Sequence, residues 1–463
     1  MAALDFKFIK TEIKKNLAVS MPLIAAQLIY AFSGFLGTAM IAHLGKNELA
    51  ASVLVNMLWA TLSTIFFGII NAVSILVSHQ YGAKNDKAIC EIMGQAYLLG
   101  IVLTLLILLA LFSMPLFLRL SHQSPEVLTL ASFYMKSLMF TVPGLVMVVI
   151  TEQFLVGVGR SKLVLQVSFM VVPLEIIMLY LLIFGKLGLP VFGIAGIGYG
   201  FAISYTLTAI GLMIYLFRAN YYKKYKIFSA INRINWLYIK ELIRVGLPMG
   251  FMQVVEVGTF AMITFWVAQF GTIILAAHQI TLQFLALAIT MVFAMSQAVT
   301  VRVGHAVGQL DKNNVVNSII TGLLINFFFA CFIAIIFCLL PKLLLSLDLN
   351  TAAADNQLLV TEAIQLFKVA SVLLLFDNFR IIGFGALRGL KDTKFPLYSS
   401  LAGFCFIGLS TAYYFAFILK LSGVSIWWGI TLGIASSAIM IMFRLRYLLR
   451  KIDLVKILEL SKK

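Results

Sequence analysis

The sequence predicts an all-α polytopic membrane protein: twelve transmembrane helices in two six-helix lobes, related by a pseudo-two-fold axis along the membrane normal. Three observations lead to this fold class. Apolar residues make up 62% of the 463 residues and charged residues only 11%. The apolar residues lie in long blocks, and landmark residues of the first half recur at a fixed distance in the second. Soluble globular domains do not combine these features.

Each apolar block is long enough to form a membrane-spanning helix, which needs roughly 20 residues. The blocks between charged or turn-forming breaks number twelve, so both ends of the chain are expected on the same side of the membrane. The predicted spans are 17–41, 50–77, 92–114, 128–154, 163–184, 192–217, 242–267, 276–301, 315–340, 361–385, 396–419 and 425–447.

Basic residues are distributed unevenly among the predicted loops. The formal net charge is +17, and with the N-terminus inside, 27 Lys and Arg residues fall in inner segments against 5 in outer loops. This bias predicts that both termini are cytoplasmic and accounts for the basic charge without a nucleic-acid partner. The first sixteen residues predict a short interfacial helix before an uncleaved first span. We expect a multi-pass protein of the bacterial cytoplasmic membrane.

The two halves of the chain repeat one design. Early landmarks recur at a separation of 226 residues and later ones at 232, which places the six added residues in the outer loop after the ninth span. The pairs are Pro22 and Pro248, Gly45 and Gly271, His79 and His305, Gly82 and Gly308, then Lys136 and Lys368, Leu155 and Leu387, Gly157 and Gly389, Lys162 and Lys394. Repeats of six spans each enter the membrane in the same direction, hence the axis along the normal.

The repeat predicts the domain organisation. Residues 1–217 would form the N-terminal lobe with spans 1–6 and the interfacial helix. Residues 218–241 would form a basic cytoplasmic linker, and residues 242–463 the C-terminal lobe with spans 7–12 and a basic tail.

Three stretches resemble signatures of a known family. TVRVGHAVGQLD (300–311), LAAHQI (275–280) and LRGLKDTKFP (387–396) are similar to segments of the NorM branch of the multidrug and toxic compound extrusion (MATE) family. The resemblance covers essentially all twelve spans. It implies a transporter rather than an enzyme, which exports small organic, often cationic compounds in exchange for Na⁺ or H⁺, without a further cofactor. We expect it to act as a monomer in the lipid bilayer.

Three carboxylates lie near the middle of predicted spans. Glu256, Asp377 and Glu175 are 11 to 13 residues from the nearest inner basic residue, or about 16 to 20 Å above the inner boundary at 1.5 Å per residue. A carboxylate at that depth needs a proton, a bound cation or a basic partner. Glu152 is nearer the inner boundary, where contact with the basic loop is expected.

Glu256 and Asp377 are the candidate cation-coupling residues. The repeat places uncharged Tyr30 and Leu145 at their counterparts, so the symmetry is broken where the charge lies. In the resemblance, both acids match positions that NorM-type transporters use for cation coupling. The hypothesis is that they bind Na⁺ or share a proton in competition with the substrate.

Arg380 leaves two interpretations open. It follows Asp377 by three residues, so the two side chains can meet on one helix face. They could form an intrahelical ion pair that neutralises both groups. Alternatively, Arg380 tunes the coupling site and is released or retained as the lobe rearranges.

The first lobe departs from the family pattern. Gly37 stands where the family commonly has Asp in span 1, and Glu175 and Leu179 stand where it often has Asn in span 5. Glu175 is a candidate for the acidic group of this lobe, or alternatively a protonated, hydrogen-bonded structural residue. Pro173 would kink the span beside it.

Further polar residues are candidates for coupling or for the substrate surface. Gln253 shares a helix face with Glu256, Gln279 shares one with Gln283, and Tyr30 is the repeat counterpart of Glu256. Phe and Met residues suit an adaptable cavity but equally suit lipid-facing packing.

Two other functions are weighed against the antiporter. A lipid-linked precursor flippase shares the two-lobed architecture but would line its cavity with several basic residues, and only Arg380 is predicted to lie deep. An intramembrane enzyme would require a Ser/Lys, Asp/Asp or HExxH arrangement. No HExxH occurs, and the two acids lack protease context.

Overall fold

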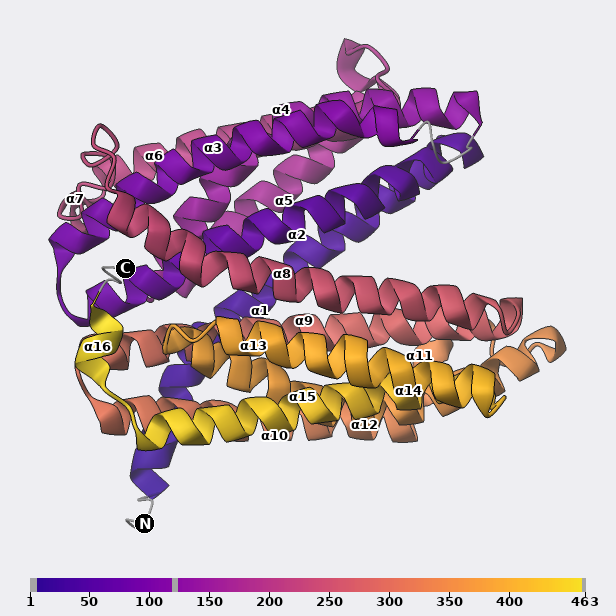
Figure 1. Ribbon diagram of the computed structural model, residues 1–463. Coiled ribbons are helices and arrows are strands. Elements are labelled where there is room, and N and C mark those ends of the chain that lie inside the picture. Colours follow the sequence, from indigo (N-terminus) through magenta and orange to yellow (C-terminus); the bar gives the residue numbers. More distant parts are fainter. Residues whose placement is uncertain (1–5, 119–123, 460–463) are drawn as a thin grey trace. The chain divides into compact units, whose positions relative to one another are not determined.

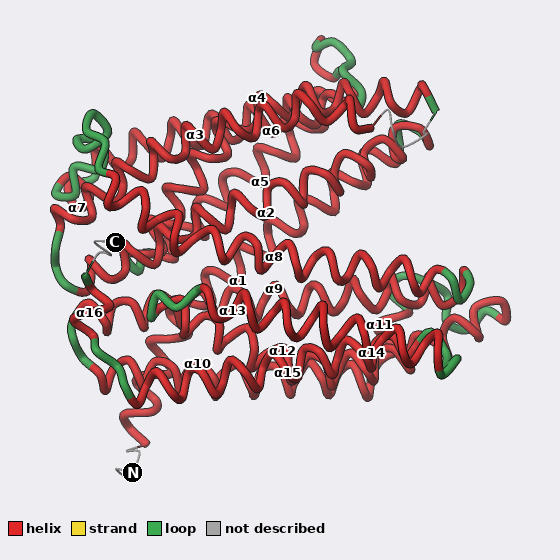
Figure 2. Tube along the Cα trace, viewed as in Figure 1, coloured by secondary structure: helices red, strands yellow, loops and turns green. Residues whose placement is uncertain are grey.

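A computed structural model of the chain describes residues 6–118 and 124–459, and the side chains of 6–10 and 116–117 lie outside this description. Figure 2 shows helices joined by loops. Among the described residues, twelve helices are long and apolar enough to cross a membrane. The predicted all-α, twelve-span fold is therefore confirmed. The predicted interfacial helix lies partly outside the description, and from Phe6 onward no break separates it from the first span.

The helices divide into two compact units, whose elements are labelled in Figure 1. Unit 2 comprises Ala25–Gly250 and Glu459 among the described residues, and unit 1 comprises Phe251–Leu458 together with the described residues up to Ile24. The boundaries lie inside helices α1 (Phe6–Ala42) and α8 (Trp236–Ala268). They are 226 residues apart, so the chain changes unit at repeat-related positions. This differs from the predicted division at a 218–241 linker.

Unit 2 contains the first set of membrane-spanning helices. They are α2 (Lys46–Gly82), α3 (Asp86–Leu118), α4 (Pro125–Gly157), α5 (Ser161–Phe184) and α6 (Ala195–Arg218), with the short α7 (Asn220–Lys223) and a 3₁₀ turn at Lys186–Gly188.

Unit 1 contains the second set. They are α9 (Thr272–Gly308), α10 (Lys312–Leu339), α11 (Pro341–Leu345), α12 (Gln357–Gly389), α13 (Lys394–Ser400), α14 (Ser410–Tyr413), α15 (Val424–Arg450) and α16 (Leu454–Leu458). A 3₁₀ turn, Ala354–Asn356, precedes α12, and the span from α13 to Ile418 contains π-helical segments at Leu401–Leu409 and Tyr414–Ile418.

The exchange of α1 and α8 between units has a packing reason. In unit 1, Asn16 of α1 donates a hydrogen bond to Thr321 of α10 at 3.0 Å, and Glu12 pairs with Arg302 of α9. In unit 2, a Cβ on Gly246 of α8 would lie only 2.6 Å from the carbonyl oxygen of Ile69. Glycine therefore lets α8 approach the α2 backbone closely, as small residues do in membrane helix pairs.

The basic linker is fixed to unit 2 by a fully buried glutamine of α3. The Gln95 amide nitrogen donates to the carbonyl oxygens of Arg233 at 2.7 Å and Ala230 at 3.3 Å. Its amide oxygen accepts from the backbone N–H of Asn235 at 3.0 Å. The linker therefore packs as part of this unit.

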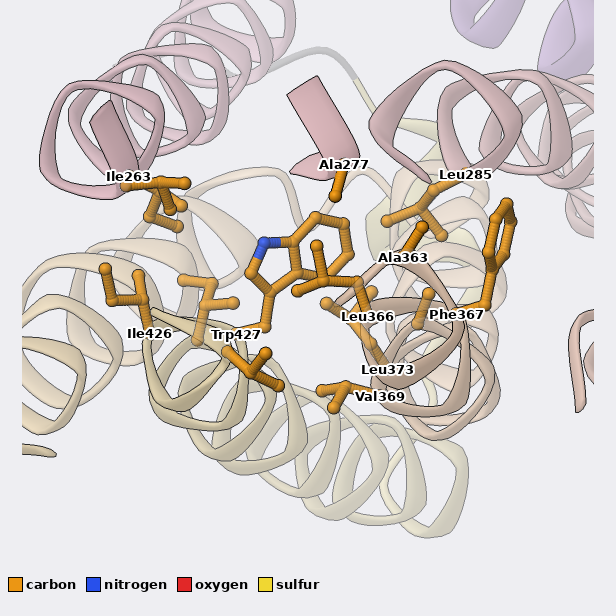
Figure 3. Close-up of a cluster of buried hydrophobic side chains, with 14 of the residues drawn as sticks. Ile263, Ala277, Leu285, Ala363, Leu366, Phe367, Val369, Leu373, Ile426 and Trp427 are labelled. Atoms are coloured by element: carbon orange, nitrogen blue, oxygen red, sulfur yellow. The ribbon is translucent and has the colours of Figure 1, made fainter. Parts of the chain in front are cut away.

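The apolar core of unit 1 holds the helices that carry its polar groups. Figure 3 shows Trp427 of α15 in the middle of a buried cluster, with side chains of α8, α9 and α12 around it. Trp427 is 1% exposed, and Phe367 and Leu373 of α12 are fully buried. This packing fixes the α8, α9, α12 and α15 surfaces against one another.

Candidate functional site

The structure brings Glu256, Asp377 and Arg380 together inside unit 1. The Arg380 Nη1 donates to Glu256 Oε1 at 2.5 Å and its Nη2 to Oε2 at 3.3 Å. Its Nε donates to Asp377 Oδ1 at 2.6 Å. Only 2% of Arg380, 2% of Asp377 and 8% of Glu256 is exposed. We call these three residues the acid–arginine cluster.

The helices explain how the cluster forms. Asp377 and Arg380 are three residues apart on α12, so their side chains lie on one face, and α8 brings Glu256 to the other side of the guanidinium. Phe404 of the π-helical segment is fully buried, and its ring centroid lies 5.0 Å from the Arg380 Cζ. Arg380 forms the ion pair with Asp377 that was one of the two interpretations left open, and it also binds Glu256 in a two-pronged contact, which the sequence did not indicate.

The cluster has an odd number of charges. With both carboxylates ionised and Arg380 protonated, its formal charge is −1. One proton or one monovalent cation would bring this to zero, and burial makes such compensation favourable. Groups of three or more His, Cys, Asp or Glu side chains that could hold a metal ion are absent from the described residues.

Arg388 is a second buried guanidinium that sequence reasoning assigned to the cytoplasmic loop. Helix α12 extends to Gly389, so Arg388 lies in its last turn and is 7% exposed. Its Nη2 donates to Ser296 Oγ at 3.0 Å, and its Cζ lies 4.1 Å from the Phe384 ring centroid. Its Nε has no hydrogen-bond partner among the described residues. The predicted depth of Asp377 was counted over the 11 residues from Asp377 to Arg388, with Arg388 taken to mark the inner boundary of the membrane. Because α12 continues to Gly389, Arg388 does not mark the end of the span.

The predicted glutamines are not part of the cluster. Gln253 is half-buried on α8, whereas Gln279 and Gln283 are exposed on α9. Hydrogen bonds between these side chains and the acid–arginine cluster are absent from the described residues.

Unit 2 has a different polar cluster, built from acids and hydroxyl groups. Ser33 Oγ of α1 donates to Glu175 Oε2 of α5 at 2.6 Å, and Tyr30 OH donates to Glu152 Oε1 of α4 at 2.9 Å. Tyr30 and Tyr205 of α6 pack against one small apolar cluster. We call these five residues the acid–hydroxyl cluster. Glu152 therefore contacts Tyr30 and not the basic loop that was expected.

One protein-family model matches both halves of the chain. The MatE family model matches residues 22–181 and 248–414, one match in each half, beginning at the repeat-related Pro22 and Pro248. The chain belongs to the MatE family. This is a transporter family, so the prediction that the chain is not an enzyme is confirmed, as is the resemblance stated from the sequence.

Several relatives of this MatE chain match it over nearly their whole length. It is 31% identical to the "Probable multidrug resistance protein NorM" of Rhizobium meliloti, covering 96% of this chain and 95% of that protein. It is 27% identical to the "Multidrug resistance protein MdtK" of Pectobacterium atrosepticum, covering 95% and 96%. The twelve helices and these bacterial relatives indicate a multi-pass inner-membrane protein.

Solved structures share the fold of this MatE chain. An outward-facing multidrug resistance MATE family transporter of the MOP superfamily has a TM-score of 0.86 at 18% identity, covering 96% of this chain and 97% of that one. A MOP superfamily transporter from Pyrococcus furiosus has a TM-score of 0.84 at 19% identity, covering 95% and 96%.

The departures of this MatE chain in its first half are adjacent in space. A Cβ on Gly37 would lie 3.5 Å from Leu179 Cδ2, so two of the three positions where the family resemblance predicts polar groups are apolar neighbours here. Ser33 and Glu175 lie one helical turn earlier on α1 and α5, and they are hydrogen-bonded to each other. The polar contact between these helices thus lies one turn away from the contact between Gly37 and Leu179.

His278 is a buried polar residue that sequence reasoning did not single out, although it lies in LAAHQI. Trp427 Nε1 donates to its Nδ1 at 3.0 Å, and its Nε2 is 2.9 Å from Thr264 Oγ1. Because an indole N–H can only donate, Nδ1 must accept and the proton resides on Nε2. His278 therefore connects α8, α9 and α15 as a neutral imidazole. The sequence signal that could have identified this residue was the position of a histidine within the LAAHQI motif of an apolar span.

Proposed function

We propose that the chain is a secondary antiporter that exports small organic compounds, cationic or amphiphilic, in exchange for inward Na⁺ or H⁺. The names of its relatives as multidrug resistance proteins support the export of organic compounds. We further propose that it acts as a monomer in the bacterial cytoplasmic membrane with both termini cytoplasmic. The coupling ion would be its only cofactor, and nucleic acid would not be a partner.

The acid–arginine cluster is the observation that carries the coupling proposal. Glu256 and Asp377 share one guanidinium inside a buried site, which leaves one formal negative charge for a proton or Na⁺ to neutralise. A cation that binds there weakens the attraction between Arg380 and the carboxylate it occupies. Each cycle would then alter the contacts that join α8 to α12.

Cation entry supplies energy for substrate release. One elementary charge that crosses the membrane inward contributes about 2.3 kcal/mol per 100 mV, in addition to its concentration gradient. Alternating access of the two lobes converts this free energy into export of the substrate, if the cation and the substrate favour different conformational states of the protein.

The acid–hydroxyl cluster is the alternative location for coupling. Glu175 has no cationic partner among the described residues, and its Oε1 has no hydrogen-bond partner. We propose Glu175 and Tyr30 as secondary coupling or substrate residues in unit 2. Gln253, Gln279 and Gln283 are proposed for the substrate surface in unit 1.

Transport in proteoliposomes tests the proposal. Export of a fluorescent organic cation would be measured with a Na⁺ gradient alone, then with a pH gradient alone. Wild-type protein and Glu126→Gln, which alters an exposed acid, should respond to one gradient, whereas Glu256→Gln should lose that response. A wild-type protein that responds to neither gradient would sink the antiporter proposal.

Arg388 is the observation that favours the flippase alternative. Its buried guanidinium contacts the Ser296 hydroxyl group and the Phe384 ring, and it would suit an anionic headgroup. The same proteoliposomes would distinguish the two functions: a flippase moves a lipid-linked pyrophosphate across the bilayer and leaves the organic cation inside.

A further inference from the structure

Two apolar grooves, one in each unit, lie at repeat-related places. In unit 2 a groove of about 320 Å³ lies between α4 and α6. In unit 1 a groove of about 310 Å³ lies between α12 and α15. The α4 residues Gly144 and Met147 correspond to the α12 residues Phe376 and Phe379, with the 232-residue offset.

The opposite walls of the two grooves match even more closely. Along α6 and α15 the lining residues are 229 residues apart and read Ala, Ile, Met in both grooves. The identical pairs are Ala209 and Ala438, Ile210 and Ile439, and Met213 and Met442. The two grooves therefore have nearly equal volumes and share the same apolar residues at three positions of this wall.

The grooves differ at one end. Phe217 closes the groove in unit 2, whereas Arg446 occupies the matched position in unit 1. Arg446 is exposed and forms no ion pair among the described residues. Its neighbour Arg444 is bound to Asp392 Oδ2 at 2.8 Å, so that carboxylate is already engaged.

We propose that the unit 1 groove is a binding site for an anionic phospholipid. An acyl chain lies along Ala438, Met442 and Phe379, and the headgroup, with its net negative charge, pairs with Arg446. An apolar groove that ends in an unpaired guanidinium complements a phospholipid at both ends, and basic pockets between transmembrane helices bind acidic headgroups. This inference is independent of the exported compound and of the coupling ion.

The groove in unit 2 is an internal reference for the effect of the headgroup charge on lipid binding. It offers the same apolar wall without the cation, so it should take acyl chains with no charge preference. A basic side chain near an anionic membrane surface contributes about 1 kcal/mol, or roughly a fivefold preference. The wild-type protein should therefore retain phosphatidylglycerol about fivefold over phosphatidylcholine.

Native mass spectrometry of the full chain tests this site. The protein would be purified in detergent, incubated with equal amounts of the two lipids, and scored for retained copies. Arg446→Phe, which copies the unit 2 groove, should abolish the preference. Met442→Trp should lower phosphatidylglycerol retention by filling the groove while Arg446 remains.

The control is Arg450→Phe, which removes an exposed cation one turn further along α15 and should leave the preference intact. A wild-type protein without preference overturns the site. So does a preference that survives Arg446→Phe or Met442→Trp, or one that Arg450→Phe abolishes equally, because the cause would then be general basic charge. Thermal unfolding of each variant establishes that it is folded.

Discussion

The two units of this protein share one fold plan and neutralise their buried acids in different ways. In unit 1, Glu256 and Asp377 both bind the Arg380 guanidinium. In unit 2, Glu152 and Glu175 have hydroxyl partners, Tyr30 and Ser33. An ion pair holds its acids in the charged form by mutual attraction, whereas a hydroxyl group can hydrogen-bond an acid in either form.

This difference separates two physical roles for a buried carboxylate. The acid–arginine cluster has a formal charge of −1 and connects α8 to α12. The acid–hydroxyl cluster contains no basic side chain among its five residues, so its acids depend on protons, on an external cation or on a cationic substrate for compensation.

Removal of the Arg380 guanidinium, which Glu256 and Asp377 share, should have the largest effect. Arg380→Ala leaves two buried carboxylates without a counter-charge, which costs on the order of 3–5 kcal/mol when a buried pair is broken. We expect a marked loss of thermal stability in detergent and no coupled transport.

The matched control removes the charges together with the arginine. A triple variant, Glu256→Gln, Asp377→Asn and Arg380→Met, should recover most of the lost stability, because no charge remains buried, but should not recover coupling. Equal instability of the single and triple variants would contradict the electrostatic explanation.

Neutralising one acid in each unit compares the two clusters directly. Glu256→Gln should reduce ion-coupled export by at least about tenfold, the effect of roughly 1.4 kcal/mol. Glu175→Gln should reduce it less than threefold, since Ser33 can still donate to the amide oxygen. Initial rates in proteoliposomes decide the order, and the opposite order would assign the coupling to unit 2.

Removal of the Ser33 hydroxyl should have a moderate effect confined to unit 2. Ser33→Ala leaves a buried carboxyl oxygen of Glu175 without its donor, which costs about 1–3 kcal/mol. The expected result is lower thermal stability, with the double variant Ser33→Ala, Glu175→Leu close to wild type. A single variant as stable as wild type would mean that Glu175 finds another donor.

Tyr30→Phe should have the smallest effect. It removes the hydrogen bond to Glu152 and keeps the aromatic ring against its apolar neighbours, so a net cost of about 1 kcal/mol is expected. Thermal unfolding would measure it. Transport should remain within twofold of wild type, and a larger loss would place Tyr30 on the substrate or cation path.

The sequence was sufficient for the fold because membrane helices leave strong local signals. Apolar blocks located all twelve spans, and repeat offsets marked matching positions such as Pro22 and Pro248. The proximity of Asp377 to Arg380 followed from helical spacing alone. In each case the information lies within one helix or one pattern along the chain.

The remaining features depend on contacts between helices, which spacing along the chain does not encode. The two-pronged contact of Arg380 with Glu256 requires the packing of α8 against α12. Arg388 was assigned to a loop because the apolar block ends before the helix does, and a buried arginine can extend a helix past its apolar segment. Glu152 was assigned to the basic loop because its partner, Tyr30, lies 122 residues away.

The exchange of α1 and α8 between units has a consequence for dissecting the gene. A cut in the linker before α8 begins at Trp236 would produce two polypeptides, each lacking a helical segment that its own bundle requires. The first product would carry Glu12 and Asn16 away from Arg302 and Thr321, and the second would carry Gly246 away from Ile69. Such fragments should be soluble in detergent as folded protein only when they are expressed together.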